Sequence, residues 1–212
     1  KAIVNSVNGE EKVMEAILPI VKKYGAAVVG LTLDENGIPA TAEGRFAIAE
    51  RILDKAMEYG IPKEDVIIDC LTLTVSAQQK EAAETLKAVK MVKEQLGLRT
   101  ALGVSNISFG LPARILVNRT FLTLAMENGL DLPIINPNDE DMMASIFAYN
   151  VLKNVDENSV KYIERYADAE IGAAALKKSP AGQQDAAARS SEDAMTGGAG
   201  SHDIFYCIEK GM

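Results

Sequence analysis

The chain has 212 residues, of which 25% are charged and 48% hydrophobic, and its net charge at pH 7 is −8. This composition is typical of a globular protein that is long enough to bury a substantial core. The acidic balance, without a run of basic residues, argues against nucleic-acid binding. No apolar run reaches the ~18 residues of a membrane-spanning helix, and no basic start precedes an apolar stretch as in a signal peptide.

The cysteines and the histidine exclude further classes. Cys70 and Cys207 lie far apart in unlike segments, so we expect no disulfide framework and a reducing, cytoplasmic location. The single histidine, His202, lies in a Gly/Ser-rich stretch, which argues against histidine-dependent hydrolases and His-rich metal sites. The sequence therefore predicts no metal site.

Five segments of the chain repeat one plan, in which a short apolar run is followed by a helical pattern. Continuous apolar runs are typical of strands that are buried on both faces. The runs occupy residues 2–4, 26–31, 66–68, 100–104 and 132–135. The helical patterns occupy residues 11–23, 42–59, 77–96, 112–128 and 139–153. Glycines that follow the first four helical patterns mark helix C-termini, and Pro112 and the acidic cluster 139–141 mark starts.

Alternation of strands and helices predicts parallel βα units, which form either a doubly wound sheet or a (β/α)₈ barrel. A doubly wound nucleotide-binding sheet would have a glycine-rich turn after its first strand, and residues 5–9 do not form one. A polar residue instead closes each strand, which favours the barrel, because such residues meet at its carboxyl-terminal rim. These residues are Asn5, Asp34 (just past Thr32), Asp69, Asn106 and Asn136.

A complete barrel has eight units in ~250 residues, and five units are visible here. Because the chain begins with Lys1 directly before a strand pattern, we expect it to be a piece of a longer protein, with the missing units upstream. We expect residues 1–166 to form the C-terminal part of the barrel and the Ala/Gly/Ser-rich residues 167–201 to form a linker. Residues 202–212 are amphipathic and predict the first helix of a following domain, or a terminal helix docked on the barrel.

The strand-end residues offer hydrogen-bonding groups and no strong nucleophile. Asp69 could accept hydrogen bonds from ligand N–H groups, or pair with a neighbouring cation. Asn106 lies among two serines and two glycines, a composition that lets a ligand approach the backbone, although a tight turn capped by Asn106 explains it too. Asp34 and Asn136 suit structural turns at least as well. Such a site fits a flat heterocycle whose reactivity comes from the ligand or from a second cofactor.

The most specific motif of the chain is Gly103–Arg114, which reads GVSNISFGLPAR. Together with residues 3–10, 34–39, 68–69 and 135–137, it resembles the pterin-binding domain of cobalamin-dependent methionine synthase and of methyltetrahydrofolate:corrinoid methyltransferases. The resemblance extends over roughly residues 1–166. The resemblance implies a (β/α)₈ barrel of the dihydropteroate synthase-like type, with the fourth to eighth strands present.

The resemblance also implies a function and a site. The activity would be transfer of the N5-methyl group of 5-methyltetrahydrofolate to cob(I)alamin, a step of methionine synthesis from homocysteine. Asn5 and Asp69 would hydrogen-bond the pterin, and Gly103 and Ser105 would form its backbone wall. Asn106 would be the catalytic residue, stabilising the protonated N5 as the methyl group leaves.

Arg114 would lie on the same rim, toward the pterin or the folate tail. No cobalamin-ligating Asp-x-His-x-x-Gly motif occurs, so cobalamin would be bound by a neighbouring domain of the parent chain or by a separate corrinoid protein. Two alternatives stay open. One is a dihydropteroate synthase-like enzyme, although residues 134–137 lack its Ser-x-Arg-x-x-His-like motif. The other is an inactive pterin-binding fragment with exposed strand edges.

Overall fold

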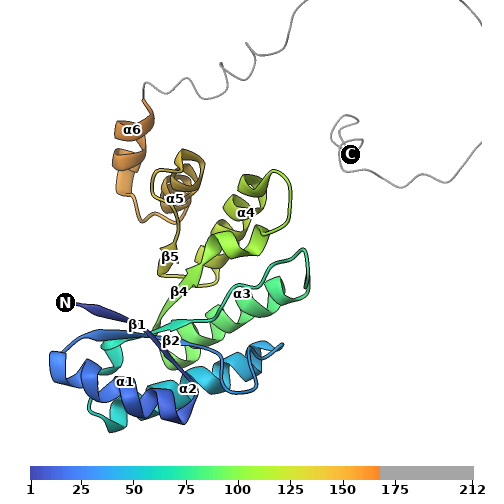
Figure 1. The fold of residues 1–212 in the computed structure, drawn as a ribbon. Coiled ribbons are helices and arrows are strands. Elements are labelled where there is room, and N and C mark those ends of the chain that lie inside the picture. The colour runs from blue at the N-terminus through green and yellow to red at the C-terminus, as the bar shows by residue number, and fades with distance from the viewer. Residues whose placement is uncertain (168–212) are drawn as a thin grey trace, which may run out of the picture. The chain divides into compact units, whose positions relative to one another are not determined.

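The computed structural model describes residues 1–167, in which helices alternate with the strands of one sheet (Figure 1). Its sheet has five strands, all parallel, in the order β1-β2-β3-β4-β5. Consecutive strands that are always neighbours are typical of a β/α barrel, whereas a doubly wound sheet reverses its order. The strands are β1 (Ile3–Asn8), β2 (Ala27–Leu31), β3 (Val66–Asp69), β4 (Arg99–Gly103) and β5 (Leu132–Ile134).

Helices alternate with the strands, which confirms the predicted class, an α/β fold that forms part of a (β/α)₈ barrel of the pterin-binding type. After α3 the chain continues through one π-helical segment, Val92–Leu96. The α-helices are α1 (Glu11–Tyr24), α2 (Ala42–Glu58), α3 (Glu81–Met91), α4 (Arg114–Glu127), α5 (Glu140–Leu152) and α6 (Val160–Tyr166).

The predicted glycine signals at helix C-termini and the predicted start at residues 139–141 are confirmed, whereas the start at Pro112 is not. Four glycines directly after helical segments adopt left-handed φ angles between 59° and 99°, which glycine adopts at little cost. They are Gly25, Gly60, Gly97 and Gly129. Asp139 caps α5 by accepting a hydrogen bond from the Met142 amide at 3.2 Å. Thr41 caps α2 in the same way, accepting from the amide of Gly44 at 3.2 Å.

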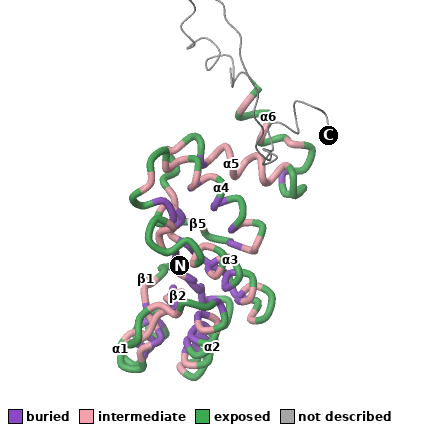
Figure 2. Tube along the Cα trace, turned by 90° about the vertical axis from the view of Figure 1, so that its right-hand side faces the viewer, coloured by how far each residue is buried: buried purple, intermediate pink, exposed green. Residues whose placement is uncertain are grey.

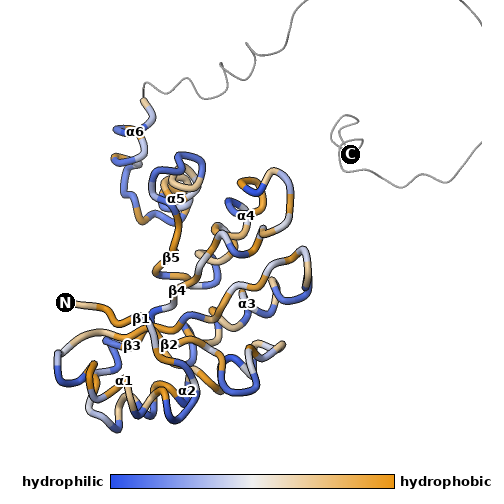
Figure 3. The backbone as a smooth tube through the Cα atoms, in the orientation of Figure 1, coloured by the Kyte–Doolittle hydropathy of each residue, from blue (hydrophilic) through white to orange (hydrophobic). Residues whose placement is uncertain are grey.

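The sheet has two different faces. The main core lies between the sheet and the helices, where Val28, Ile68 and Leu102 pack against helical residues such as Leu18 and Ile52. Figure 2 shows these buried stretches on the inner sides of the helices, and Figure 3 shows the strands as mostly hydrophobic segments between helices of mixed character. The other face carries a small separate group, here called the inner cluster, formed by Val29, Ile67 and Ala101 with partly buried Leu31.

The structure corrects several predicted boundaries. β1 does not end at Asn5, since its pairing with β2 continues to Asn8 across an irregularity between Asn5 and Val7. α3 begins at Glu81 rather than at residue 77, because residues 74–80 form turns. α4 begins at Arg114 and not at Pro112, because Ala113 has a φ of +47° that a helix cannot accommodate.

The helix α6 was not predicted. Both carboxylate oxygens of Asp156 accept hydrogen bonds from backbone amides at its start, those of Lys161 and Tyr162, at 3.1 and 2.9 Å. Apart from Ala167, the predicted linker 167–201 and the predicted segment 202–212 lie outside the described residues. None of the helices within residues 1–167 is long and apolar enough to cross a membrane.

Candidate functional site

The candidate residues share the face of the sheet that carries the inner cluster. Side chains alternate along a strand, so Asp69 and Gly103, each two residues after a member of the inner cluster, lie on that face. Asn5 pairs in register with the member on β2, which places it on the same face. Three of the predicted site residues, from three strands, therefore border one surface opposite the helices.

Asp69 ends β3 and has an unusual environment for a carboxylate. Its residue is 8% exposed, and no ion pair of residues 1–167 includes it. Oδ1 accepts a hydrogen bond from the Leu71 amide at 2.8 Å. Burial raises the pKa of Asp69 to about 6, and the Leu71 hydrogen bond opposes part of that rise. Pairing with a neighbouring cation was the structural alternative to ligand binding for Asp69. No such cation is found among the described residues.

Asn106 lies beyond β4, in a short 3₁₀ segment, Val104–Ser108. The residue is exposed, and its side-chain amide makes no hydrogen bond with the described residues. The Nδ2 atom lies 3.1 Å from where a Cβ would stand on Gly103. Because Gly103 has no side chain, the Asn106 amide can lie next to the end of β4.

Arg114 supports the loop that holds Asn106. Its Nε donates to the Ser108 hydroxyl at 2.9 Å, and Nη2 donates to the Ser105 carbonyl at 2.8 Å. The guanidinium also lies over the Phe109 ring, 4.5 Å from its centre. These contacts hold the 105–109 loop in one conformation, so the Arg114 guanidinium stabilises this loop.

The loops after β3 and β4 are tied together, a feature that sequence reasoning missed. The Val75 amide donates to the Ile107 carbonyl at 3.0 Å. The hydroxyls of Thr74 and Ser76 both donate to the Phe109 carbonyl, each at 2.7 Å. These bonds join residues more than 30 positions apart. They therefore hold the loop that follows Asp69 and the loop that contains Asn106 as one unit.

Other polar residues at this edge belong to turns. Asp34 accepts from the Asn36 amide at 2.9 Å and pairs with Arg51 at 3.5 Å. Asn136 accepts from the Asn138 amide at 3.1 Å. The prediction that a polar residue closes every strand was wrong in detail: Asp69 is the residue that ends its strand, while Asn5 lies within β1 and the others follow their strands. Local side-chain-to-backbone bonds explain these turn residues.

A buried arginine was also missed. Arg45 lies on the same stripe of α2 as Ile48, Ala49 and Ile52, and it is completely buried. The signal was present in the sequence, because a cation at core spacing on an amphipathic helix requires buried partners. Its partners include the backbone directly after Asp69, as described below.

The hollows on the described surface are not lined by the candidate site residues Asn5, Asp69 and Asn106. One of about 360 Å³ lies near Gly9, Arg51 and Lys55, and an apolar groove of about 430 Å³ runs between α3 and α4. Within residues 1–167 no cluster of three or more His, Cys, Asp or Glu is placed to hold a metal ion. The candidate site thus offers one carboxylate and free amides on an open sheet face.

Comparison with known proteins shows the family of the chain. Residues 1–136 match the sequence profile of the family described as pterin binding enzyme. The chain is 31% identical over 173 residues to the methylcorrinoid:tetrahydrofolate methyltransferase of Eubacterium limosum, a match that covers 80% of this chain and 64% of that protein. It is 38% identical over 149 residues to the methionine synthases of Mycobacterium leprae and Mycobacterium tuberculosis, covering 64% of this chain and 12% of each synthase.

A parallel βα fold with polar residues on its inner face, together with these matches, defines the class of protein. The chain belongs to the pterin-binding enzyme family. The three relatives named above, a methylcorrinoid:tetrahydrofolate methyltransferase and two methionine synthases, fall in the group that the motif Gly103–Arg114 indicated. The chain spans less than two thirds of the length of these relatives.

Proposed function

We propose that this chain is the pterin-binding part of a cobalamin-dependent methyltransferase. It binds 5-methyltetrahydrofolate and takes part in transfer of the N5-methyl group to cob(I)alamin, as a step of methionine synthesis from homocysteine. The names of the relatives support a methyltransferase, and the family match supports a pterin ligand. We also propose a cytoplasmic location, because the spacing of the two cysteines predicts no disulfide framework.

The observation that carries the proposal is the buried carboxylate of Asp69, which has no cation partner in the described chain. A buried carboxylate is costly unless it is compensated. A pterin ring presents N–H donors along one edge, and a carboxylate accepts hydrogen bonds from them. Asn5, on the same face and without a side-chain hydrogen bond in the described chain, would add a second contact to the ring.

Asn106 would serve the chemistry. The amine N5 is a poor leaving group until it is protonated, so a polar group whose hydrogen bond strengthens as positive charge develops there lowers the barrier. The uncommitted, exposed amide of Asn106 can make that bond. Gly103 and Ser105 would form the adjacent backbone wall, and Arg114, which holds the Ser105 carbonyl, would support this wall from behind.

Cobalamin does not fit the residues of this chain. The sequence has no Asp-x-His-x-x-Gly motif, and its single histidine lies outside the described residues. We therefore propose that cobalamin is held by another domain or by a separate corrinoid protein. In the first case residues 167–201 would be the linker and residues 202–212 the start of the following helical domain.

Equilibrium binding of 5-methyltetrahydrofolate to the full chain tests the proposal. We expect saturable binding that Asp69→Asn weakens, with folding checked by circular dichroism. The control for the amide is Asn128→Ala, which removes a partly exposed asparagine at the C-terminal end of α4 whose amide donates to the Leu124 carbonyl, away from the candidate site. In an assay that contains 5-methyltetrahydrofolate, cob(I)alamin and the separate corrinoid domain, Asn106→Ala should lower the rate of methyl transfer. A folded chain that binds no 5-methyltetrahydrofolate would contradict the proposal.

A further inference from the structure

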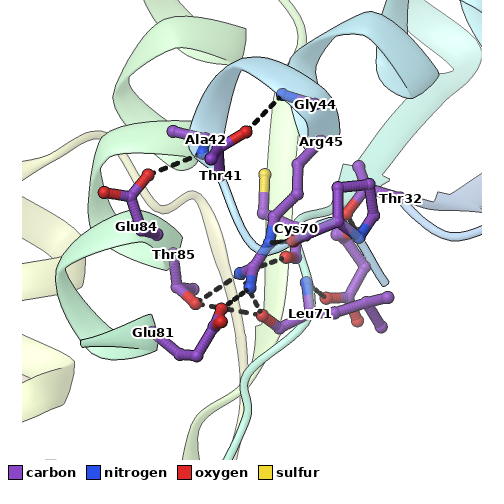
Figure 4. A network of polar contacts seen from close by, with 12 residues as sticks. Thr32, Thr41, Ala42, Gly44, Arg45, Cys70, Leu71, Glu81, Glu84 and Thr85 are labelled. Carbon is purple, nitrogen blue, oxygen red and sulfur yellow. Dashed lines mark hydrogen bonds and ion pairs between the residues drawn. The ribbon is translucent and has the colours of Figure 1, made fainter. Parts of the chain in front are cut away.

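The backbone that follows Asp69 is held by a side chain from a different helix. Arg45 of α2 is completely buried, and its guanidinium reaches the start of the β3–α3 loop (Figure 4). Nη1 donates to the carbonyls of Cys70 at 3.2 Å and Leu71 at 3.1 Å. Nε donates to the Pro39 carbonyl at 2.9 Å. One planar cation therefore fixes the backbone of the residues directly after Asp69.

Two side chains of α3 complete this network. The Thr85 hydroxyl lies 2.6 Å from Nη1 of Arg45 and 3.2 Å from the Leu71 carbonyl, so it joins the guanidinium to the loop. Glu81 forms an ion pair with Nη2 and supplies the opposite charge that a buried guanidinium requires. Figure 4 shows these groups converging from α2, α3 and the loop.

Leu71 is the link between this network and the candidate site. Its carbonyl accepts from Arg45 and from Thr85, while its amide donates to Oδ1 of Asp69 at 2.8 Å. Its φ is +61°, in the left-handed region that a leucine adopts only when its surroundings hold it there. The orientation of the Asp69 carboxylate thus depends on the backbone of a strained residue, Leu71. Arg45 and Thr85 hold its carbonyl, and Arg45 also holds the Cys70 carbonyl, which shares a peptide group with the Leu71 amide.

We propose that Arg45 is a positioning residue, which acts through the Leu71 peptide to hold Asp69 in the orientation that binds the ligand. This inference rests on the proposed pterin site. Arg45 does not itself reach the ligand, because it lies in the core on the helix side of the sheet. A lysine cannot replace it, since one ammonium group cannot donate to the Pro39 carbonyl, the loop carbonyls and Glu81 together.

A double-mutant cycle separates this role from a general effect on folding. Arg45→Lys should weaken 5-methyltetrahydrofolate binding roughly tenfold in the parent chain and less than twofold in an Asp69→Asn background. Thr85→Val, which keeps the volume and removes the hydroxyl, should weaken binding about threefold, and Thr85→Ser should restore it. The control Arg51→Lys changes a half-exposed arginine of the same helix and should leave binding unchanged.

A second measurement needs no ligand. The titration of the Asp69 carboxyl, followed by carbon-13 NMR in the full chain, should have its midpoint near pH 6. In Thr85→Val and in Arg45→Lys the midpoint should move away from pH 6, because a loosened loop changes both the burial that raises the pKa of Asp69 and the Leu71 hydrogen bond that lowers it. Arg51→Lys should not move it. Thr85→Val keeps the test available if Arg45→Lys does not fold.

The two measurements distinguish the proposals. A chain that binds no 5-methyltetrahydrofolate but shows the shifted midpoint would overturn the proposed function and support the positioning role. Binding by the parent chain, with equal losses from Arg45→Lys in both backgrounds and an unmoved midpoint, would overturn the positioning role and leave the proposed function standing.

Discussion

Two aspartates follow neighbouring strands of the sheet and have opposite surroundings. Asp34, after β2, accepts from a backbone amide of its own turn and pairs with Arg51. Asp69, at the end of β3, is buried without a cation partner in the described chain and keeps one oxygen free of hydrogen bonds. The Asp34 carboxylate is already stabilised by its neighbours. Burial of the Asp69 carboxylate costs free energy, which hydrogen bonds from a ligand can offset.

The asparagines at the same edge repeat the contrast. Asn136 uses its side-chain oxygen in a turn with the Asn138 amide, while the Asn106 amide makes no hydrogen bond with the described residues. The residue type is the same within each pair, and all four residues lie at or shortly after the end of a strand. What separates a candidate site residue from a turn residue is therefore whether the side chain is already satisfied by its neighbours.

The amide pair should show the largest difference. Asn106→Ala should slow methyl transfer by ~10²–10³, by analogy with the loss of one donor that stabilises a developing charge. Asn136→Ala should change the rate less than about threefold, because it removes only a turn contact. Single-turnover transfer from 5-methyltetrahydrofolate to cob(I)alamin measures both. Equal effects of the two substitutions would refute the distinction.

Stability should separate the aspartates next. The pKa of Asp69 is raised to about 6 in the folded state, so its stabilising contribution is present below pH ~4 and is lost as pH rises through 6. Asp69→Asn should then increase the free energy of unfolding at pH 7 by as much as about 3 kcal/mol, with little gain at pH 4. Asp34→Asn should not stabilise the chain at either pH. Urea unfolding at both pH values provides the test, and a less stable Asp69→Asn at pH 7 would count against it.

Ligand affinity should show the reverse order. Asp69→Asn should weaken binding of 5-methyltetrahydrofolate roughly tenfold to a hundredfold, because a hydrogen bond to a charged group contributes about 1.5–3 kcal/mol. Asp34→Asn should alter the affinity less than about twofold. Titration calorimetry at pH 7.5 compares them. If the two variants lose the same affinity, the open face of the sheet is not the ligand site.

The smallest effect concerns the glycine beside Asn106. A Cβ on Gly103 would stand 3.1 Å from Nδ2 of Asn106 and displace that amide, while its φ of −74° suits any residue. Gly103→Ala should fold normally and slow transfer about tenfold, and it should add little in an Asn106→Ala background. Gly25→Ala, at a helix end where φ is +59°, should lower stability without slowing transfer, so it separates a loss of stability from a displaced amide. Additive losses would show that Gly103 acts independently of the amide.

The order and type of the elements could be predicted from the sequence, because continuous apolar runs and glycine-terminated helical patterns are local signals. Strands β2 to β5 and the ends of α1 and α2 follow them closely, whereas β1 extends beyond its predicted run to Asn8. The start of α3 could not be predicted in this way. Thr74 and Ser76 precede a helical pattern, but their hydroxyls bond to the Phe109 carbonyl in another unit, and this contact depends on the tertiary fold.

The residues of the candidate site were proposed from the sequence, whereas the contacts that surround them in the structure were not. Asp69 and Asn106 were identified by their place after a strand and by the motif around Asn106. The network that supports Asp69 was missed, although Arg45 at a core position of α2 was a usable sign. The positive φ of Leu71 had no such sign, since leucine adopts it here only because side chains from two helices hold its carbonyl.

The most direct measurement is an NMR titration of the full chain with 5-methyltetrahydrofolate, followed through backbone amides. The account predicts saturable shifts at residues 69–71 and 103–106, with the turn at 34–37 unchanged. Shifts confined to the apolar groove between α3 and α4, or no saturable shifts at all, would contradict the assignment of the pterin site to the open face of the sheet.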